Sequence, residues 1–232
     1  SFIKSLGNVV LMTVIYAVLM FVLSFLFALL LTKLTPKTAN VAKVVTYLPF
    51  MLSGILLSVI FIFLFSQNGL FNALRMSHDA DGISFATDGI WPYVIIILPL
   101  LWGGFGYNSL VMYAGLLNIP NAYYEAAEID GANQFQAFSM LILPLIVPAI
   151  FMVGLLSFVG IWNEYIMSIT FIKDQAKYTL SVGINELMND ATAGETLKFA
   201  ALIIAMLPIL IVYAIFQKPL QDGLSSSDGV KG

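Results

Sequence analysis

Apolar residues occur along this chain in long unbroken runs. Five stretches contain no Asp, Glu, Lys, Arg or His and are 19 to 36 residues long: residues 5–32, 44–74, 89–124, 131–163 and 199–217. A helix needs about 20 apolar residues to cross the roughly 30 Å of hydrocarbon in a bilayer. Strands of an outer-membrane barrel would instead alternate apolar and polar positions. The pattern therefore predicts an all-α integral membrane protein, a polytopic bundle of about five transmembrane helices.

Polar residues and prolines set the expected limits of the spans. We predict a single transmembrane domain over residues 1–232, with spans at about residues 8–32, 44–66, 91–113, 140–162 and 199–217. Five spans place the two ends of the chain on opposite sides of the membrane. Residues 33–43, which we expect to form a polar turn, contain three Lys and no acid. Such a bias favours a cytoplasmic position for this turn.

Three of the spans have further expected features. Pro and Gly interrupt the third, which predicts a kink near Trp102–Asn108, because Pro removes a backbone donor and Gly permits bending. Residues 163–198 carry eight charges and follow the fourth. We expect an external excursion there, with a short amphipathic piece around residues 180–190. Lys218 and Pro219 are expected to end the last span, before a short polar tail.

Composition agrees with a membrane protein and excludes several functions. The chain is 60% hydrophobic and 10% charged, with a formal net charge of −3, so it lacks the basic field of a nucleic-acid binder. It has no Cys and one His, which removes thiol nucleophiles, Cys-ligated zinc and His-pair metal motifs. Asp79-x-Asp81-Gly82 resembles part of a calcium loop, but its twelfth position is Ile90 instead of an acid. We predict no catalytic and no metal-binding residues.

A short segment between the third and fourth spans carries three acids, at Glu125, Glu128 and Asp130. Pro120 suits the first turn of a helix, and Asn118 or Asn121 can cap that helix. Gly131 can end it, because Gly most readily adopts a positive φ. The segment therefore predicts a short helix over about residues 121–131, outside the hydrocarbon.

One side of this helix would carry Tyr123, Ala127 and Asp130, with Ala126 and Ile129 on the adjoining strip. Paired alanines allow a partner backbone to approach closely, and the acids offer charge-assisted hydrogen bonds to Arg or Lys. A connector lying on the membrane surface is the alternative. Membrane-surface helices favour Lys and Arg, whereas anionic lipid repels acids. A protein partner is therefore favoured.

The segment resembles the EAA signature of permeases of ATP-binding-cassette (ABC) importers. Residues 125–148 read EAAEIDGANQFQAFSMLILPLIVP, in which Pro144 follows Gly131 by thirteen residues, and AGLLNIPNAYYEAA leads into them. The resemblance extends over nearly the whole chain and is closest to the maltose-type branch, which carries oligosaccharides, disaccharides and glycerol-phosphate compounds. Residues 160–165, GIWNEY, are similar to the second permease of that branch. Members usually carry at least one more helix before Ser1, so we expect a trimmed N-terminus or a five-span core.

The resemblance implies a type I importer permease core in the inner membrane of a bacterium or archaeon. Its partners would be a second, related permease, two cytoplasmic ATPase subunits and an external solute-binding protein that delivers sugar. The chain would bind no cofactor, since ATP and Mg²⁺ would bind the ATPase. The helix at 121–131 would be a cytoplasmic coupling helix that docks into the ATPase. The implied coupling residues are Tyr124, Glu125, Ala126, Ala127, Asp130 and Gly131.

Candidate substrate contacts are aromatic, amide and carboxylate side chains in or near the spans. They are Trp102, Tyr107, Asn108, Trp162, Asn163, Glu164 and Tyr165. Each also has a structural interpretation, because Trp and Tyr anchor at membrane interfaces and Asn bonds across helices. We expect Glu164 to be near enough to a span end to reach water.

Two other functions stay open. An ion-coupled secondary transporter would normally carry ionisable groups at mid-membrane, and the predicted spans hold none away from their ends. A membrane scaffold subunit without a transport role would leave the acidic helix unexplained.

Overall fold

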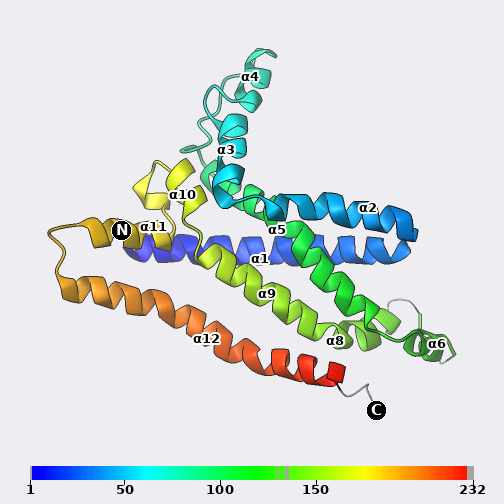
Figure 1. The fold of residues 1–232 in the computed structure, drawn as a ribbon. Coiled ribbons are helices and arrows are strands. Elements are labelled where there is room, and N and C mark those ends of the chain that lie inside the picture. The colour runs from blue at the N-terminus through cyan, green and yellow to red at the C-terminus, as the bar shows by residue number, and fades with distance from the viewer. Residues whose placement is uncertain (1, 130, 134–135, 229–232) are drawn as a thin grey trace.

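The computed structural model describes residues 2–129, 131–133 and 136–228, and every regular element in that part of the chain is helical (Figure 1). The first half contains α1 (Phe2–Lys33), α2 (Pro36–Tyr47), the 3-10 helix η1 (Leu48–Met51), α3 (Gly54–Phe65), α4 (Leu70–Met76) and α5 (Trp91–Leu117). The second half contains α6 (Asn121–Ile129), the π-helical η2 (Ala137–Ile142), α8 (Leu143–Leu145), α9 (Val147–Trp162), α10 (Ile166–Phe171), the 3-10 helix η3 (Gln175–Lys177), α11 (Leu180–Asn189) and α12 (Glu195–Asp228).

Five helical stretches in the described residues are long and apolar enough to cross a membrane. They are Ile3–Lys33, Gly54–Met76, Trp91–Leu117, Val147–Phe171 and Glu195–Lys218. The predicted fold class, an all-α polytopic membrane protein, is confirmed.

Helix α1 packs along both α5 and α9 and lies at the centre of the bundle (Figure 1). Its buried positions recur every four residues, at Met12, Tyr16, Met20, Ser24 and Ala28. Outward positions with the same spacing are about half exposed, at Val14, Val18, Val22 and Leu26. Residues four apart share one face of a helix, so α1 turns one stripe to the protein and an apolar one outward. The outward stripe suits contact with lipid.

Glycines let α5 pack closely against its neighbours. A Cβ on Gly106 would overlap the carbonyl oxygen of Thr46 near the end of α2. A Cβ on Gly104 would lie 2.8 Å from the Cε of Met20 on α1. Helix α5 is continuous through Trp102–Asn108, so the predicted kink does not break the helix there. These glycines serve close helix packing.

The second span differs from the single helix predicted over residues 44–66. The polar turn expected at 33–43 is mostly the start of α2, which Thr35 caps through its side chain and Pro36 begins. Ser and Thr at the N-cap and Pro in the first turn are standard helix starts, so this signal was readable in the sequence.

The same span is then interrupted at residues 48–53. Pro49 lies in η1, and Ser53 begins α3 by accepting a hydrogen bond from the N–H of Leu56 at 3.2 Å. Figure 1 shows α3 and α4 running across the direction of α1 instead of beside it. The prediction of one uninterrupted helix was wrong, because Pro and a new cap split the apolar run.

The segment after α9 is not wholly external, as was predicted for residues 163–198. Helix α10 buries Met167 and Phe171 and packs against α3 and α5. The candidate fourth span therefore extends over Val147–Phe171 instead of 140–162. Helix α11 occupies the place of the amphipathic piece expected around 180–190.

The last helix, α12, packs on α9 and α11 and continues past Lys218 and Pro219, whereas its candidate span, Glu195–Lys218, ends at Lys218 as expected. The indole N–H of Trp162 on α9 donates to the carbonyl oxygen of Ala205 on α12 at 3.2 Å. This hydrogen bond ties the two helices together where the otherwise apolar surfaces meet.

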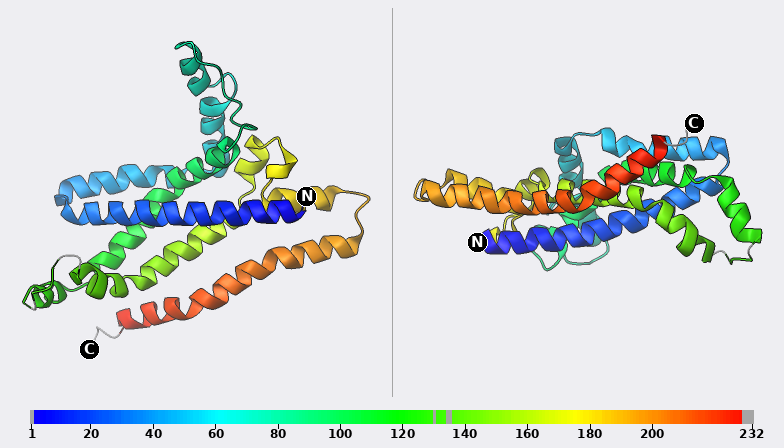
Figure 2. Two further views of the ribbon diagram at one scale, coloured as in Figure 1. Left: turned by 180° about the vertical axis from the view of Figure 1, so that it is seen from behind. Right: turned by 90° about the horizontal axis from the view of Figure 1, so that it is seen from below.

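The two ends of the bundle carry different elements. Both views in Figure 2, like Figure 1, place the start of α1 together with α10 and α11 at one end. They place α6, the start of α2 and the C-terminal end of α12 at the other. We call these the α10 end and the α6 end.

Candidate functional site

Helix α6 projects from the α6 end of the bundle, and its main neighbour within the chain is η2 (Figure 1). It lies where the sequence predicted a helix over 121–131. Asn118 is the C-cap residue of α5. Its backbone N–H donates to the carbonyl oxygen of Ala114 at 3.1 Å. Asn118 therefore closes α5 and does not start α6.

The end of α6 is built around Gly131, whose φ is +72°. The N–H of Ala132 donates to the carbonyl oxygen of Ala127 at 2.9 Å. A left-handed Gly followed by this hydrogen bond is the Schellman arrangement, which satisfies a carbonyl at the helix end. The prediction that Gly131 ends the helix with a positive φ is confirmed.

The chain starts the next helix with a reciprocal cap that the sequence analysis missed. The N–H of Asn133 donates to Gln136 Oε1, and the N–H of Gln136 donates to Asn133 Oδ1, both at 2.9 Å. This is the arrangement of a capping box, recognisable from Asn-x-x-Gln. A C-terminal and an N-terminal cap therefore flank a very short connection, which limits the directions that α6 can take relative to η2.

The surface of α6 is open on nearly all sides. Ile129 is 86% exposed and Tyr123 46% exposed, and Tyr124, Glu125 and Ala126 are also exposed. Ala127 is partly buried. Aromatic residues that face solvent on a helix with little internal packing are characteristic of a protein interface.

The coupling residues expected from the sequence thus fall on one exposed element. Tyr124, Glu125, Ala126 and Ala127 lie on α6, and Gly131 forms its end. Asp130 lies outside the described residues. The coupling role of this set stays a prediction, which the geometry makes possible by keeping the helix free of the bundle.

Three candidate substrate residues lie on α5, each with partners of its own. Trp102 is partly exposed and packs at 5.9 Å from Phe61, and Tyr107 stacks on Phe50 at 4.7 Å. Asn108 is buried and donates its Nδ2 to the carbonyl oxygen of Gly104 at 2.9 Å, within α5. Its Oδ1 has no hydrogen-bond partner in the described part of the chain.

The other four candidates lie at the junction of α9 and α10. Trp162 is buried and holds α12, as described above, and the exposed Asn163 donates to the carbonyl oxygen of Val159 at 3.0 Å. Tyr165 is partly buried at the start of α10. A sugar-binding role for these residues stays a prediction.

Glu164 is only 6% exposed, so the expectation that it reaches water was wrong. Its Oε1 accepts from the N–H of Met167 at 2.5 Å and its Oε2 from the N–H of Ser168 at 3.0 Å. Both carboxylate oxygens thus satisfy donors in the first turn of α10, which would otherwise be unpaired. The lengthened fourth span contains this acid, which corrects the statement that no span holds an ionisable group away from its ends. Its two backbone partners give it a structural role.

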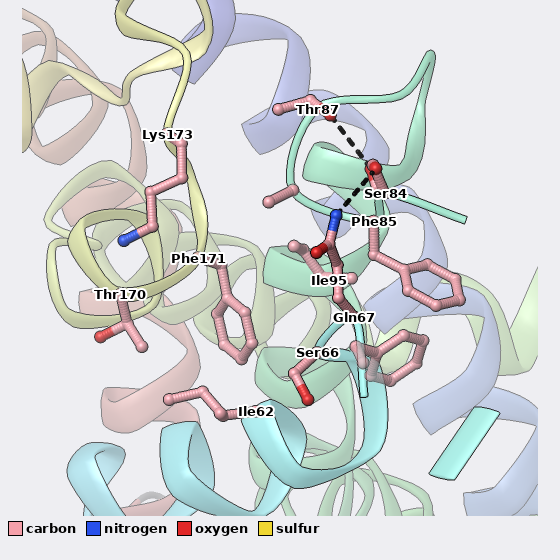
Figure 3. A pocket seen from close by; sticks show the side chains of 12 residues that line it. Ile62, Ser66, Gln67, Ser84, Phe85, Thr87, Ile95, Thr170, Phe171 and Lys173 are labelled. Atoms are coloured by element: carbon pink, nitrogen blue, oxygen red, sulfur yellow. Dashed lines mark hydrogen bonds between the residues drawn. The ribbon is translucent and has the colours of Figure 1, made fainter. Parts of the chain in front are cut away.

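A cavity that the sequence did not suggest lies between the end of α3, residues 84–87 and α10, with a volume of about 390 Å³ (Figure 3). None of the seven candidate substrate residues lines it. Lys173 and Gln67 are among its lining residues. They come from separate parts of the chain, and no motif links them.

Five apolar candidate spans, with an exposed helix between the third and the fourth, define a multi-pass membrane protein. The chain belongs to the family described as "Binding-protein-dependent transport system inner membrane component", whose sequence model matches residues 33–226. The predicted relationship to importer permeases is confirmed.

Its relatives include permeases of sugar transport systems. The chain is 30% identical over 140 residues to the diacetylchitobiose uptake system permease protein of Streptomyces coelicolor, covering 59% of this chain and 43% of that protein. It is 35% identical over 130 residues to the maltose/maltodextrin transport system permease protein of Photorhabdus laumondii, covering 56% of this chain and 44% of that protein. The chain spans about half the length of the curated relatives it matches.

The fold is similar to that of a chain of a bacterial alginate ABC transporter, solved in complex with an alginate pentasaccharide-bound periplasmic protein. The TM-score is 0.76 at 23% sequence identity, over 92% of this chain and 76% of that chain. This similarity shows that the helices are arranged as in an ABC transporter permease.

Proposed function

We propose that this chain is a transmembrane subunit of an ATP-driven importer and forms part of the path for a sugar or oligosaccharide. An external solute-binding protein would deliver the substrate. The observation that carries the proposal is α6: a short helix, capped where it ends and exposed on nearly all sides, which projects from one end of the bundle. Family membership and the names of the relatives support the transport role and the carbohydrate class.

The importer would contain a second permease, a different but related chain, and two cytoplasmic ATPase subunits. ATP and Mg²⁺ would bind those subunits, and hydrolysis would take place on them. The complex would lie in the inner membrane of a bacterium or archaeon, with lipid around it and no nucleic acid. Lys33, at the end of α1, and Lys37, at the start of α2, lie at the same end of the bundle as α6. These two cations support a cytoplasmic position for that end.

Helix α6 offers the chemistry that a groove on an ATPase could hold. The exposed Tyr123 and Ile129 supply apolar area, and Glu125 can accept charge-assisted hydrogen bonds from Arg or Lys. Ala126 leaves room for the partner backbone to approach. Because α6 has little packing of its own, docking would cost few contacts within the chain.

Force on α6 would reach the bundle by two routes. The chain enters α6 directly from α5 and leaves it through η2 and α8 into α9. Helices α5 and α9 both pack on α1 and on each other. A displacement of α6 would therefore act on the two helices that flank the central one.

Coupling of this kind is a linkage between two conformations. ATP can drive the change only as far as its binding favours one state of the ATPase pair, and the docked helix transmits that preference. Moving an equilibrium from 1:99 to 99:1 requires about 5.5 kcal/mol. A rigid end at Gly131 would help, because a helix that bends at its junction dissipates the displacement.

The test is ATP-driven sugar uptake by the complete transporter in proteoliposomes. Glu125→Lys should lower both ATPase association and uptake by about 10-fold or more, since a hydrogen bond to a charged group contributes roughly 1.5–3 kcal/mol. Asp81→Lys is the matched control, because it reverses the charge of an exposed acid in the loop after α4. Full uptake by the Glu125 variant would refute the proposed coupling role of α6.

A further inference from the structure

Helices α3 and α10, which contribute to the cavity, both lie away from α6 (Figure 1), and Figure 3 shows the side chains that line the cavity. With about 390 Å³ the cavity falls within the roughly 300–1,000 Å³ typical of ligand pockets. Its lining is mostly apolar, with Ile62, Phe65, Phe85, Ile95 and Phe171 among the contributors. A few polar side chains complete it, which is the usual composition of a small-molecule site.

The wall formed by the chain around α4 is held by a buried amide. Asn72 is 1% exposed and accepts from the N–H of Ile83 at 2.8 Å while its Nδ2 donates to the carbonyl oxygen of Ile83 at 2.9 Å. The same Nδ2 donates to the carbonyl oxygen of Ser66 at 3.3 Å. Asn72 therefore fastens the two segments, 66–67 and 83–87, that form one side of the cavity.

Further hydrogen bonds fix the shape of this wall. Gln67 Nε2 donates to Ser84 Oγ at 3.4 Å, and Asp88 Oδ2 accepts from the N–H of Ser84 at 3.0 Å. Lys177, from the segment after α10, donates its Nζ to the carbonyl oxygen of Thr87. Hydrogen bonds thus connect the segments of this wall to one another and to the chain after α10. The shape of the cavity is therefore fixed before a ligand binds.

The charge of the cavity is carried by Lys173. Its lining residues include no Asp and no Glu, and Lys173 is the one cation among them. Lys173 is exposed and makes no hydrogen bond or ion pair with any residue that the structure describes. Figure 3 shows Lys173 and Thr170 on one side of the cavity and Gln67, Ser84 and Thr87 on the facing side.

We propose that this cavity binds one unit of an incoming saccharide that carries a carboxylate. This inference rests on the proposed function and narrows its substrate class to acidic sugars. Lys173 pairs with the carboxylate, Thr170 and Gln67 hydrogen-bond to ring hydroxyls, and Phe171 lies against the apolar C–H face of the ring. An unpaired ammonium on one side of the cavity and an amide and hydroxyls on the other suit a sugar acid.

A lipid chain fits the same cavity less well. The Thr170 hydroxyl and the Lys173 ammonium would lose water to hydrocarbon without gaining a partner, which costs free energy. A saccharide hydroxyl replaces that water directly. The position of α3 and α10 away from α6 also suits a substrate that arrives from outside the cell.

The experiment titrates the complete transporter in nanodiscs of phosphatidylcholine with digalacturonic acid and with its neutral counterpart, galactobiose, by calorimetry. The wild-type transporter should bind the acid at least 10-fold more tightly. Lys173→Gln should weaken the binding of digalacturonic acid by about 10-fold or more. It should weaken the binding of galactobiose much less, since only the charge-assisted hydrogen bond is lost. Lys4→Gln, which removes an exposed Lys near the start of α1, is the matched control and should change neither.

A second variant tests the position of the site. Thr170→Trp fills the cavity and should abolish binding of the acid, while thermal unfolding in detergent shows whether the bundle remains folded. Equal binding of both sugars by the wild type, or unchanged affinity for the acid in Lys173→Gln, overturns the proposal. Phospholipid retained by the wild type and lost in Thr170→Trp, without sugar binding, assigns the cavity to lipid and also overturns it.

Failure of this inference and failure of the proposed function give different results. ATP-driven uptake that depends on Glu125, together with a negative titration, would remove the cavity site and leave the importer. Selective binding of digalacturonic acid without any ATP-driven uptake would remove the importer and leave the site.

Discussion

The centre of α5 and the end of α6 both depend on glycine, for different physical reasons. At Gly106 there is no room for a side chain, because a Cβ would lie 2.7 Å from the backbone nitrogen of Tyr47. At Gly131 the space is free, with nothing within 4 Å of a Cβ, but φ is +72°. The first glycine is needed for packing between helices, and the second for the conformation of a single residue.

This difference matches the surroundings of the two helices. Helix α5 is packed against α1, η1, α2 and α9, so its sequence is constrained by neighbours. Helix α6 is exposed, so its sequence is free of internal packing and available to a partner. Substitutions in α5 should therefore act on the stability of the bundle, and substitutions at the end of α6 on coupling.

The largest effect on stability is expected for Gly106→Ala. The added methyl group meets backbone atoms, which cannot rotate away, and overpacking of this kind costs about 1–3 kcal/mol or more. The midpoint of thermal unfolding in detergent should fall clearly. Gly160→Ala is the control, because Gly160 lies on α9 with nothing within 4 Å of its Cβ. Equal melting of both variants would show that α5 and α2 are not in close contact.

A smaller effect is expected for Glu164→Gln, at the junction of the packed helices. The amide keeps one acceptor and turns an NH₂ group toward backbone donors, so the free energy of unfolding should fall by about 1–3 kcal/mol. The KM for sugar in uptake assays should not change, because the carboxylate accepts hydrogen bonds from backbone N–H groups of α10 instead of binding substrate. Glu186→Gln, the same change at an exposed Glu on α11, is the control. A raised KM without loss of stability would place Glu164 in the substrate path instead.

The smallest effect on the bundle is expected for Gly131→Ala. A left-handed conformation costs a residue with a side chain about 1–2 kcal/mol, and the end of α6 alone bears that cost. Thermal unfolding of the bundle should stay unchanged, whereas ATP-driven uptake should fall several-fold. Gly89→Ala carries a similar strain, at φ +52°, in the loop before α5, and should leave uptake intact. A loss of bundle stability as large as that of Gly106→Ala would remove the distinction between the two regions.

The sequence was most informative where structure depends on local features. The charge-free runs predicted five spans, and the predicted end of the first, at residue 32, agrees with the end of α1 at Lys33, although α1 begins earlier, at Phe2. Gly131 predicted the end of α6, because a positive φ is a property of one residue. The start of α2 at Thr35 and Pro36 and the cap formed by Asn133 and Gln136 are equally local, and both follow from the residue types at these positions.

The sequence was least informative where apolar residues can be buried either in lipid or against other helices. Residues 44–66 read as one span, yet Pro49 and Ser53 divide them into α2, η1 and α3. Residues 166–171 are too few to read as part of a span, yet α10 is buried against α3 and α5. Apolar composition reports burial in lipid and burial in protein alike, so it cannot distinguish these arrangements.

The sequence alone determined the class of protein, the number of candidate spans and the place and end of the exposed helix, since each follows from the chemistry of neighbouring residues. Only the tertiary structure decided that Gly106 meets Thr46, that Trp162 bonds to Ala205, and that Gln67, Ser84 and Lys173 line one cavity. Those contacts join residues far apart in the chain. Their geometry depends on how whole helices pack, which no local pattern specifies.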